Sequence, residues 1–251
     1  MKKRFLENPN FPENKVTTVY ADVDDIALKT TFNDLSIKVV NVIENPFIDA
    51  PIRCHADIFA NYIGKSTFLS DKHQIELCKF IDDNNGKSVI IENIKSPYPN
   101  DCLLNFADIG DYIIGNKSIL TEKIAEFLPN KPIIDVKQGY SKCSVCICKR
   151  NTIITDDISV YNAVLQCDNI NSLLVEKGSV HINKYDYGFI GGCCGLIDKN
   201  TLFFNGDLSL HSDFDKIKKF LYDNDVNYID IKGKPLTDIG SIIPIMEIDG
   251  D

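Results

Sequence analysis

Short apolar runs of four to seven residues recur along the chain, roughly every 40 to 60 residues. Their length and their Ile, Val and Leu content are typical of buried β-strands, so each run predicts the first strand of a repeating unit. The runs lie at residues 37–43, 88–91, 132–136, 172–175 and 228–231.

A second pattern follows within each unit. A strand that ends in Ser, Thr or Asn leads into an acidic residue, which is predicted to open an amphipathic helix because acids and hydroxyls suit the exposed amides of a helix start. The five copies are KSTFLSD at 65–71, NKSILTE at 116–122, NTIITD at 151–156, NTLFFNGD at 200–207 and KVTTVYAD at 15–22. The stripes predicted to face the core are Ile75, Cys78 and Ile81; Ile158, Tyr161 and Leu165; and Phe214, Ile217 and Leu221.

One stretch of sequence returns with some residues kept and others changed. Laid 51 residues downstream, ADI at 56–58 falls on ADI at 107–109, and IG at 63–64 falls on IG at 114–115. This match indicates an internal repeat. His55 has no counterpart, because Phe106 stands at the corresponding position. We therefore expect His55 to serve something other than the scaffold.

Five units fill the chain if its two ends share one of them. The predicted boundaries are 36–86, 87–130, 131–171, 172–226, and 227–251 together with 15–35. The sequence thus predicts an α/β fold with a single domain, in which residues 15–34 pack beside residues 228–246 and close a ring. The alternative is an open α/β sheet, in which the two ends would lie far apart.

Composition and charge narrow the class of protein. With 251 residues, of which 44% are hydrophobic, the chain can bury a sizeable core. Its net charge of −9, with acids spread along the sequence, argues against a nucleic-acid-binding surface. The sequence has no apolar run of membrane-spanning length, and residues 1–9 include no apolar region of signal-peptide length, so we expect a cytoplasmic protein without a membrane partner. The nine cysteines then favour reduced thiols over a disulfide framework.

Five such units in a ring resemble the pentein fold, a five-fold pseudosymmetric α/β propeller of ββαβ units. The sequence also resembles an uncharacterised bacterial family of that fold in the strings KQGYSKCSVC at 137–146, YGFIGGCCG at 187–195 and DIGSIIP at 238–244. Penteins include arginine deiminase, dimethylarginine dimethylaminohydrolase and the amidinotransferases. The resemblance implies a Cys-dependent hydrolase or amidinotransferase that acts on a small guanidino or amidino compound without a cofactor. The alternative is a non-catalytic pentein used for binding or assembly.

The resemblance also implies catalytic residues. In pentein enzymes a His-x-Asp segment on the second strand of one unit faces a cysteine on the second strand two units further on. His55 and Asp57 match that segment, and Cys143 stands at the start of the matching strand. We expect Cys143 to be the nucleophile, with a pKa lowered by Lys142 or by protonated His55. His55 is expected to transfer protons, and Asp57 to orient it or to bind the cation.

The residues expected to bind the substrate match the pentein pattern less closely than the expected catalytic residues do. The second strand of the fourth unit, residues 188–195, has no Arg-Asp segment of the kind that binds guanidinium in the family. Asp108 and Asp238 are the carboxylates that we expect to face the channel, with Lys142 beside them.

Structural roles for the same residues stay open. His55 is also consistent with a histidine satisfied in the core. Asp57 has a repeat equivalent in Asp108, which is consistent with a scaffold residue that bonds a turn. Cys194 follows two glycines and is the second candidate nucleophile.

A structural zinc site is the other chemistry that the cysteines suggest, through the spacing Cys143-x-x-Cys146-x-Cys148. Side chains alternate along a strand, so Cys146 and Cys148 share a face that Cys143 does not. The sequence therefore predicts no metal site here.

Overall fold

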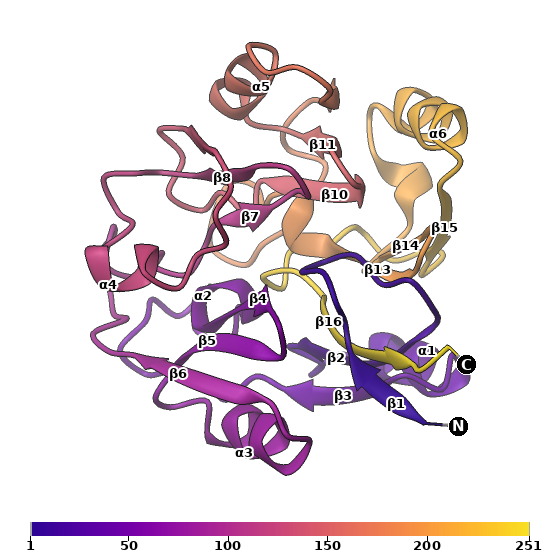
Figure 1. Cartoon of the computed structure of the whole chain (residues 1–251). Helices are drawn as coiled ribbons and strands as arrows, with labels where there is room; N and C mark the ends of the chain where they lie inside the picture. Colours follow the sequence, from indigo (N-terminus) through magenta and orange to yellow (C-terminus); the bar gives the residue numbers. More distant parts are fainter. Residues whose placement is uncertain (1, 251) are drawn as a thin grey trace.

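The strands form five small sheets around a common centre (Figure 1). The structure is a computed structural model and describes residues 2–250. Four sheets have three strands: β4 (Ala60–Gly64), β5 (Thr67–Asp71) and β6 (Lys87–Ile91); β7 (Ala107–Asp108), β8 (Ile113–Gly115) and β9 (Ile133–Asp135); β10 (Val145–Lys149), β11 (Thr152–Thr155) and β12 (Asn171–Leu174); and β13 (Cys194–Asp198), β14 (Thr201–Phe204) and β15 (Asn227–Asp230). The fifth sheet has the order β1 (Lys3–Phe5), β16 (Ile243–Ile248), β2 (Val16–Ala21) and β3 (Lys38–Asn41).

All five sheets share one pairing pattern. An antiparallel pair such as β4 and β5 is extended by a parallel strand such as β6. The same order holds in the other four sheets. The parallel strand is the one that opens the next predicted unit, so backbone hydrogen bonds join each unit to its successor.

The helices that connect the parallel strands lie on the outside of the ring (Figure 1). They are α1 (Ile26–Asp34), α3 (Ile75–Asp83), α4 (Glu122–Ala125), α5 (Ile158–Val164) and α6 (Phe214–Asp223), while α2 (Ala56–Phe59) is a single turn before β4. Two short 3₁₀ turns complete the secondary structure at Gly191–Cys193 and Leu208–Leu210. Within residues 2–250, none of the helices has the length and apolar character that crossing a bilayer requires.

Two of the three predicted helix stripes are wrong. In α3 the buried residues are Leu77 and Ile81, and Ile75 is 67% exposed. In α5 they are Val160 and Val164, whereas Ile158 and Leu165 are each more than half exposed. Both helices carry two apolar stripes at an equivalent spacing, so periodicity does not choose between them. In α6 the predicted Ile217 and Leu221 are buried.

The two ends of the chain close the ring, as predicted. Strand β16 lies between β1 and β2, with Phe5 opposite Met246 and Tyr20 opposite Ile243. The core continues from one sheet to the next at this closure. Phe32 of α1 stacks against Phe203 of β14, with 4.9 Å between the ring centres. The five-fold ring thus depends on contacts between residues from opposite ends of the sequence.

Candidate functional site

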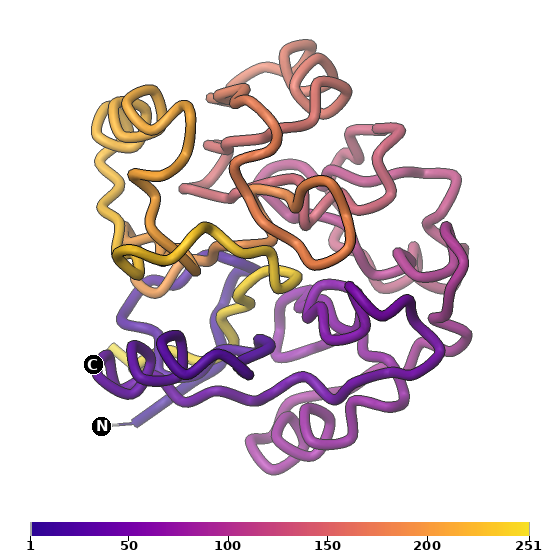
Figure 2. Tube along the Cα trace, turned by 180° about the vertical axis from the view of Figure 1, so that it is seen from behind, coloured from indigo at the N-terminus to yellow at the C-terminus, as the bar shows by residue number. Residues whose placement is uncertain are grey.

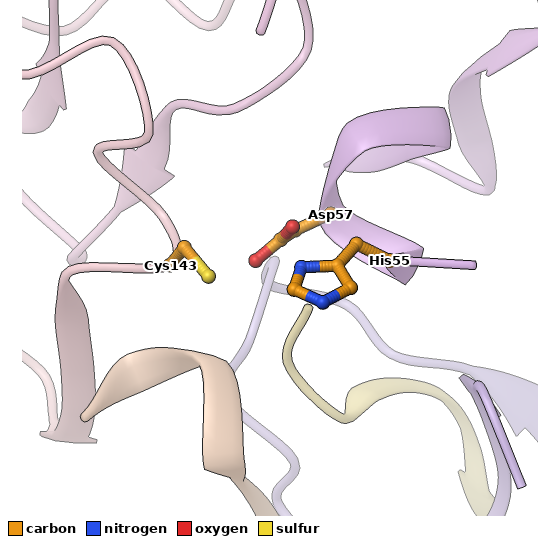
Figure 3. A group of neighbouring side chains, drawn as sticks. All are labelled: His55, Asp57 and Cys143. Atoms are coloured by element: carbon orange, nitrogen blue, oxygen red, sulfur yellow. The ribbon is translucent and has the colours of Figure 1, made fainter. Parts of the chain in front are cut away.

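His55, Asp57 and Cys143 meet near the centre of the ring (Figure 3). One donor atom from each side chain lies within 4.8 Å of the other two, and all three residues are buried. His55 and Cys143 come from units two apart, and the ring brings them together. This proximity is the arrangement that the sequence resemblance implied, and the same three atoms are close enough to ligate one metal ion.

The sequence resemblance predicted that His55 and Cys143 lie on strands. This prediction is wrong for both residues. His55 immediately precedes α2, where the amide of Asp57 donates to the carbonyl of Gly240 at 2.9 Å. Cys143 lies in a turn two residues before β10. The side-chain oxygen of Asn105 accepts from the Lys142 and Cys143 amides, at 2.8 and 3.1 Å, and so fixes that turn.

Asp238 is the residue that contacts both reactive side chains. Its carboxylate oxygens each lie 3.4 Å from the Cys143 Sγ, and Oδ1 lies 3.7 Å from the His55 Nδ1. The amides of Phe189 and Gly240 each donate to it at 2.9 Å. These amides hold the carboxylate in place against the thiol.

A glycine makes room for this carboxylate. A Cβ placed on Gly192 would lie 2.0 Å from Oδ1 of Asp238, well inside van der Waals contact. Only a residue without a side chain therefore fits opposite the carboxylate. Gly192 of the Gly-Gly pair thus serves the packing of Asp238, while its neighbour Gly191 lies against the backbone of Val145 and Cys143.

One carboxylate oxygen of Asp57 has no hydrogen-bond donor. Its Oδ2 accepts a 2.8 Å hydrogen bond from the Ser241 hydroxyl, while its buried Oδ1 has no hydrogen-bond partner. Burial raises the pKa of Asp57, and the nearby Asp238 raises it further. An unsatisfied buried carboxylate oxygen is costly, and a cation donating N–H groups would relieve that cost.

The expectation of a lowered Cys143 pKa is wrong for the thiol as it stands in this structure. Burial raises this pKa well above its ordinary value, and the carboxylates of Asp238 and Asp57 raise it further. Negative neighbours disfavour the thiolate. Any reaction through this sulfur therefore needs a positive charge beside it.

The sequence pattern placed the acidic residue that opens a helix at Asp156. The N-cap of α5 is Asp157, one residue later, whose carboxylate accepts from the Ser159 and Val160 amides. Asp156 is instead buried, accepts from the Ile190 amide at 2.9 Å through Oδ2, and has no partner at Oδ1. Burial raises its pKa to about 7, and Asp238 contributes in the same direction. The sequence signal for this second role was the pair of adjacent acids, Asp156 and Asp157, at the end of β11, since only one of them is needed to cap the helix.

The other predicted site residues lie apart from this group. The Asp108 carboxylate pairs with the Lys131 Nζ at 2.6 Å and accepts from the Gly110 amide, so it serves the scaffold of its own unit. Cys194 begins β13, where its buried thiol donates to the Gly191 carbonyl at 3.7 Å. Cys194 and Lys142 line a separate cavity of about 10 Å³.

The Cys146 and Cys148 thiols lie 3.9 Å apart on one buried face of β10. Cys143 instead faces His55 and Asp57 (Figure 3). The predicted shared face of Cys146 and Cys148 is confirmed, whereas Cys143 lies in the turn before β10, so strand alternation does not apply to it.

A cavity of about 320 Å³ opens onto Cys143, His55 and Asp238. Much of its wall is the loop over residues 182–189, which Figure 2 shows in orange near the middle of the molecule. A second cavity, of about 590 Å³, shares His55 and Asp238 with the first and includes Asp22 but not Cys143. The thiol is therefore reached through the first cavity.

The model of a family described as "Family of unknown function (DUF6873)" matches residues 22–243. The chain belongs to this family. No curated protein matches the sequence.

Solved structures identify the fold of this family member as the pentein fold, as predicted from the sequence. The chain is similar to an amidinotransferase from Microseira wollei in the saxitoxin biosynthetic pathway, with a TM-score of 0.59, 10% identity, and coverage of 97% of this chain and 98% of that one. It is similar to inosamine-phosphate amidinotransferase from Streptomyces griseus, with a TM-score of 0.60, 9% identity, and 98% of both chains covered. It is also similar to agmatine deiminase from C. jejuni, with a TM-score of 0.58, 10% identity, and coverage of 100% and 98%.

Proposed function

We propose that this protein is a Cys-dependent hydrolase or amidinotransferase that acts on a small guanidino or amidino compound. The observation that carries the proposal is the group of Cys143, His55, Asp57 and Asp238 at the end of a cavity, with one carboxylate oxygen left unpaired. The enzymes named in the similar structures act on compounds of this kind, which supports the same substrate class here.

The first step is binding of the planar cation. A guanidinium presents several N–H donors in one plane, and Asp57, which has an unpaired oxygen and lies close to His55 and Cys143, is the acceptor for such bonds. Asp238 adds a further carboxylate beside the sulfur. Because these acids are buried, their charges are costly until a cation pairs with them.

Binding then activates the thiol. The substrate cation offsets the carboxylates that, together with burial, raise the Cys143 pKa, so the thiol gives up its proton to His55 in the complex. The thiolate attacks the central carbon and forms a tetrahedral intermediate. His55 donates a proton to the departing nitrogen, the C–N bond breaks, and an amidino group remains bonded to Sγ.

The second step releases that group. A water molecule or an acceptor amine gives a proton to His55 and attacks the carbon bonded to sulfur. The S–C bond breaks, the thiol is restored, and the product is a ureido compound or a new guanidino compound. Water as acceptor makes the protein a hydrolase, and an amine makes it an amidinotransferase.

Labelling with 2-chloroacetamidine, an amidinium compound with an alkylating carbon, tests the proposal. Peptide mapping is expected to find the label on Cys143, because the carboxylates place the amidinium beside that sulfur. An excess of uncharged 2-chloroacetamide serves as the control and is expected to label Cys143 more slowly. Label on Cys194 would move the nucleophile, and label spread without preference would favour a non-catalytic binding or assembly protein.

A further inference from the structure

Away from Cys143, His55 and Asp238, the wall of the cavity is apolar and acidic. We propose that this cavity selects guanidino or amidino compounds whose tail is cationic or neutral, and rejects those whose tail ends in a carboxylate. This inference rests on the proposed function, since it concerns the far end of the same substrate.

Four aromatic side chains line that wall: Tyr140, Tyr185, Tyr187 and Phe189. Tyr187 and Phe189 meet edge to face, with 6.2 Å between ring centres. Aromatic faces attract cations and alkyl chains, and they offer a carboxylate no compensation for its lost hydration. The rings therefore suit a tail that is apolar or positively charged.

The charged groups around the tail are acidic. Asp186 lines the cavity, and Asp101 is buried behind Tyr140 with one carboxylate oxygen unpartnered. Burial raises the pKa of both Tyr140 and Tyr185, and Asp101 contributes in the same direction for each. Among residues 2–250, no lysine or arginine lines the cavity. A tail carboxylate would meet like charge and no ion-pair partner.

Two basic side chains outside the cavity, Lys177 and Arg53, each contact another residue. Lys177 is exposed, and its Nζ lies 5.3 Å from the centre of the Tyr187 ring and bonds the Tyr187 hydroxyl. Arg53 lines the second cavity, where it pairs with Glu44 at 2.7 Å. Cys143 lines the first cavity and not the second, which Arg53 lines.

Three probes with the same four-carbon chain test the selection: 4-guanidinobutylamine, butylguanidine and 4-guanidinobutanoate. Turnover is measured with the wild-type protein, and binding is measured calorimetrically with Cys143→Ser. The amine and the alkyl probe are expected to exceed the acid by roughly tenfold or more in kcat/KM and in affinity, as one unit charge at short range would produce. Equal or stronger binding of the acid would overturn the selection and leave the proposed function standing.

A charge reversal at the wall tests the cause. Asp186→Lys is expected to reduce the preference for the amine over the acid by roughly threefold to tenfold. Asp34→Lys is the matched control, because Asp34 is exposed at the end of α1 and does not line the cavity. An unchanged preference in Asp186→Lys would contradict the inference. If none of the three probes binds or reacts, the proposed function fails, and the inference fails with it.

Discussion

The Cys143 sulfur lies 3.4 Å from both carboxylate oxygens of Asp238, a residue 95 positions away in the sequence. The two lie in different sheets' connecting loops, and the ring brings them into contact. A thiol facing a carboxylate is poorly prepared to ionise alone. Under the proposed function, a substrate cation that shares the site would offset this carboxylate and favour the thiolate.

The assignment of the nucleophile predicts unequal effects for two buried cysteines. Cys143→Ser is expected to lower turnover of a guanidino substrate by at least roughly 10³-fold, because the hydroxyl is a far weaker nucleophile here. Cys194→Ala is the matched control and is expected to retain activity within a few fold, since Cys194 lines another cavity. Steady-state kinetics measure both. Comparable losses in the two variants would argue that both act through stability.

Removing the negative charge of Asp238 is expected to lower the pKa of Cys143. Asp238→Asn should therefore increase alkylation of Cys143 by iodoacetamide at pH 8 by roughly tenfold, because more of the thiol is ionised. The pH dependence of the alkylation rate should shift toward lower pH. Asp108→Asn, the change at the equivalent position of another unit, should leave both unchanged. A slower reaction in Asp238→Asn would contradict this electrostatic account.

The raised pKa of Asp156 predicts that the free energy of unfolding falls as pH rises. Its folded pKa is raised from 3.8 to about 7, so the folded protein binds this proton more tightly than the unfolded chain does. The stabilisation is complete below pH 3.8 and is lost as pH rises through about 7. It amounts to at most about 4 kcal/mol.

Asp156→Asn keeps an acceptor for the Ile190 amide and removes the ionisation. Urea unfolding is expected to show the variant gaining stability over the wild type between pH 5 and pH 8. Asp34→Asn, at an exposed position, is the control and should follow the wild type. A constant difference between Asp156→Asn and the wild type would mean that Asp156 does not titrate in this range.

The close approach of Gly192 to Asp238 predicts a large effect for a small substitution. In Gly192→Ala the new Cβ would meet Oδ1 of Asp238 at 2.0 Å, so the carboxylate must move away from Cys143. We expect a loss of roughly 2 to 4 kcal/mol in the free energy of unfolding together with a strong loss of activity. Gly115→Ala, whose Cβ would meet nothing closer than 3.2 Å, should cost less. Thermal unfolding and turnover compare the two.

The sequence determined much of the architecture. The repeated strand and turn pattern identified five units and the closure of the ring by its two ends, because hydrophobic spacing and helix-start chemistry are local properties. It did not determine which stripe of α3 or α5 is buried, because two stripes are equally apolar and only the neighbouring sheet selects one.

In the candidate site, too, the sequence predicted some features and only the tertiary structure decided others. The sequence predicted that His55 and Cys143 lie together, because His55 breaks a repeat and Cys143 stands where the pentein resemblance expects a cysteine, and the structure places both in one group. The sequence also proposed both Asp108 and Asp238 for the cation, since they occupy equivalent positions in two units. The tertiary structure separates them: Lys131 neutralises one, and the other faces a thiol. That difference arises from which side chains the closed ring places beside each acid, and no local pattern encodes it.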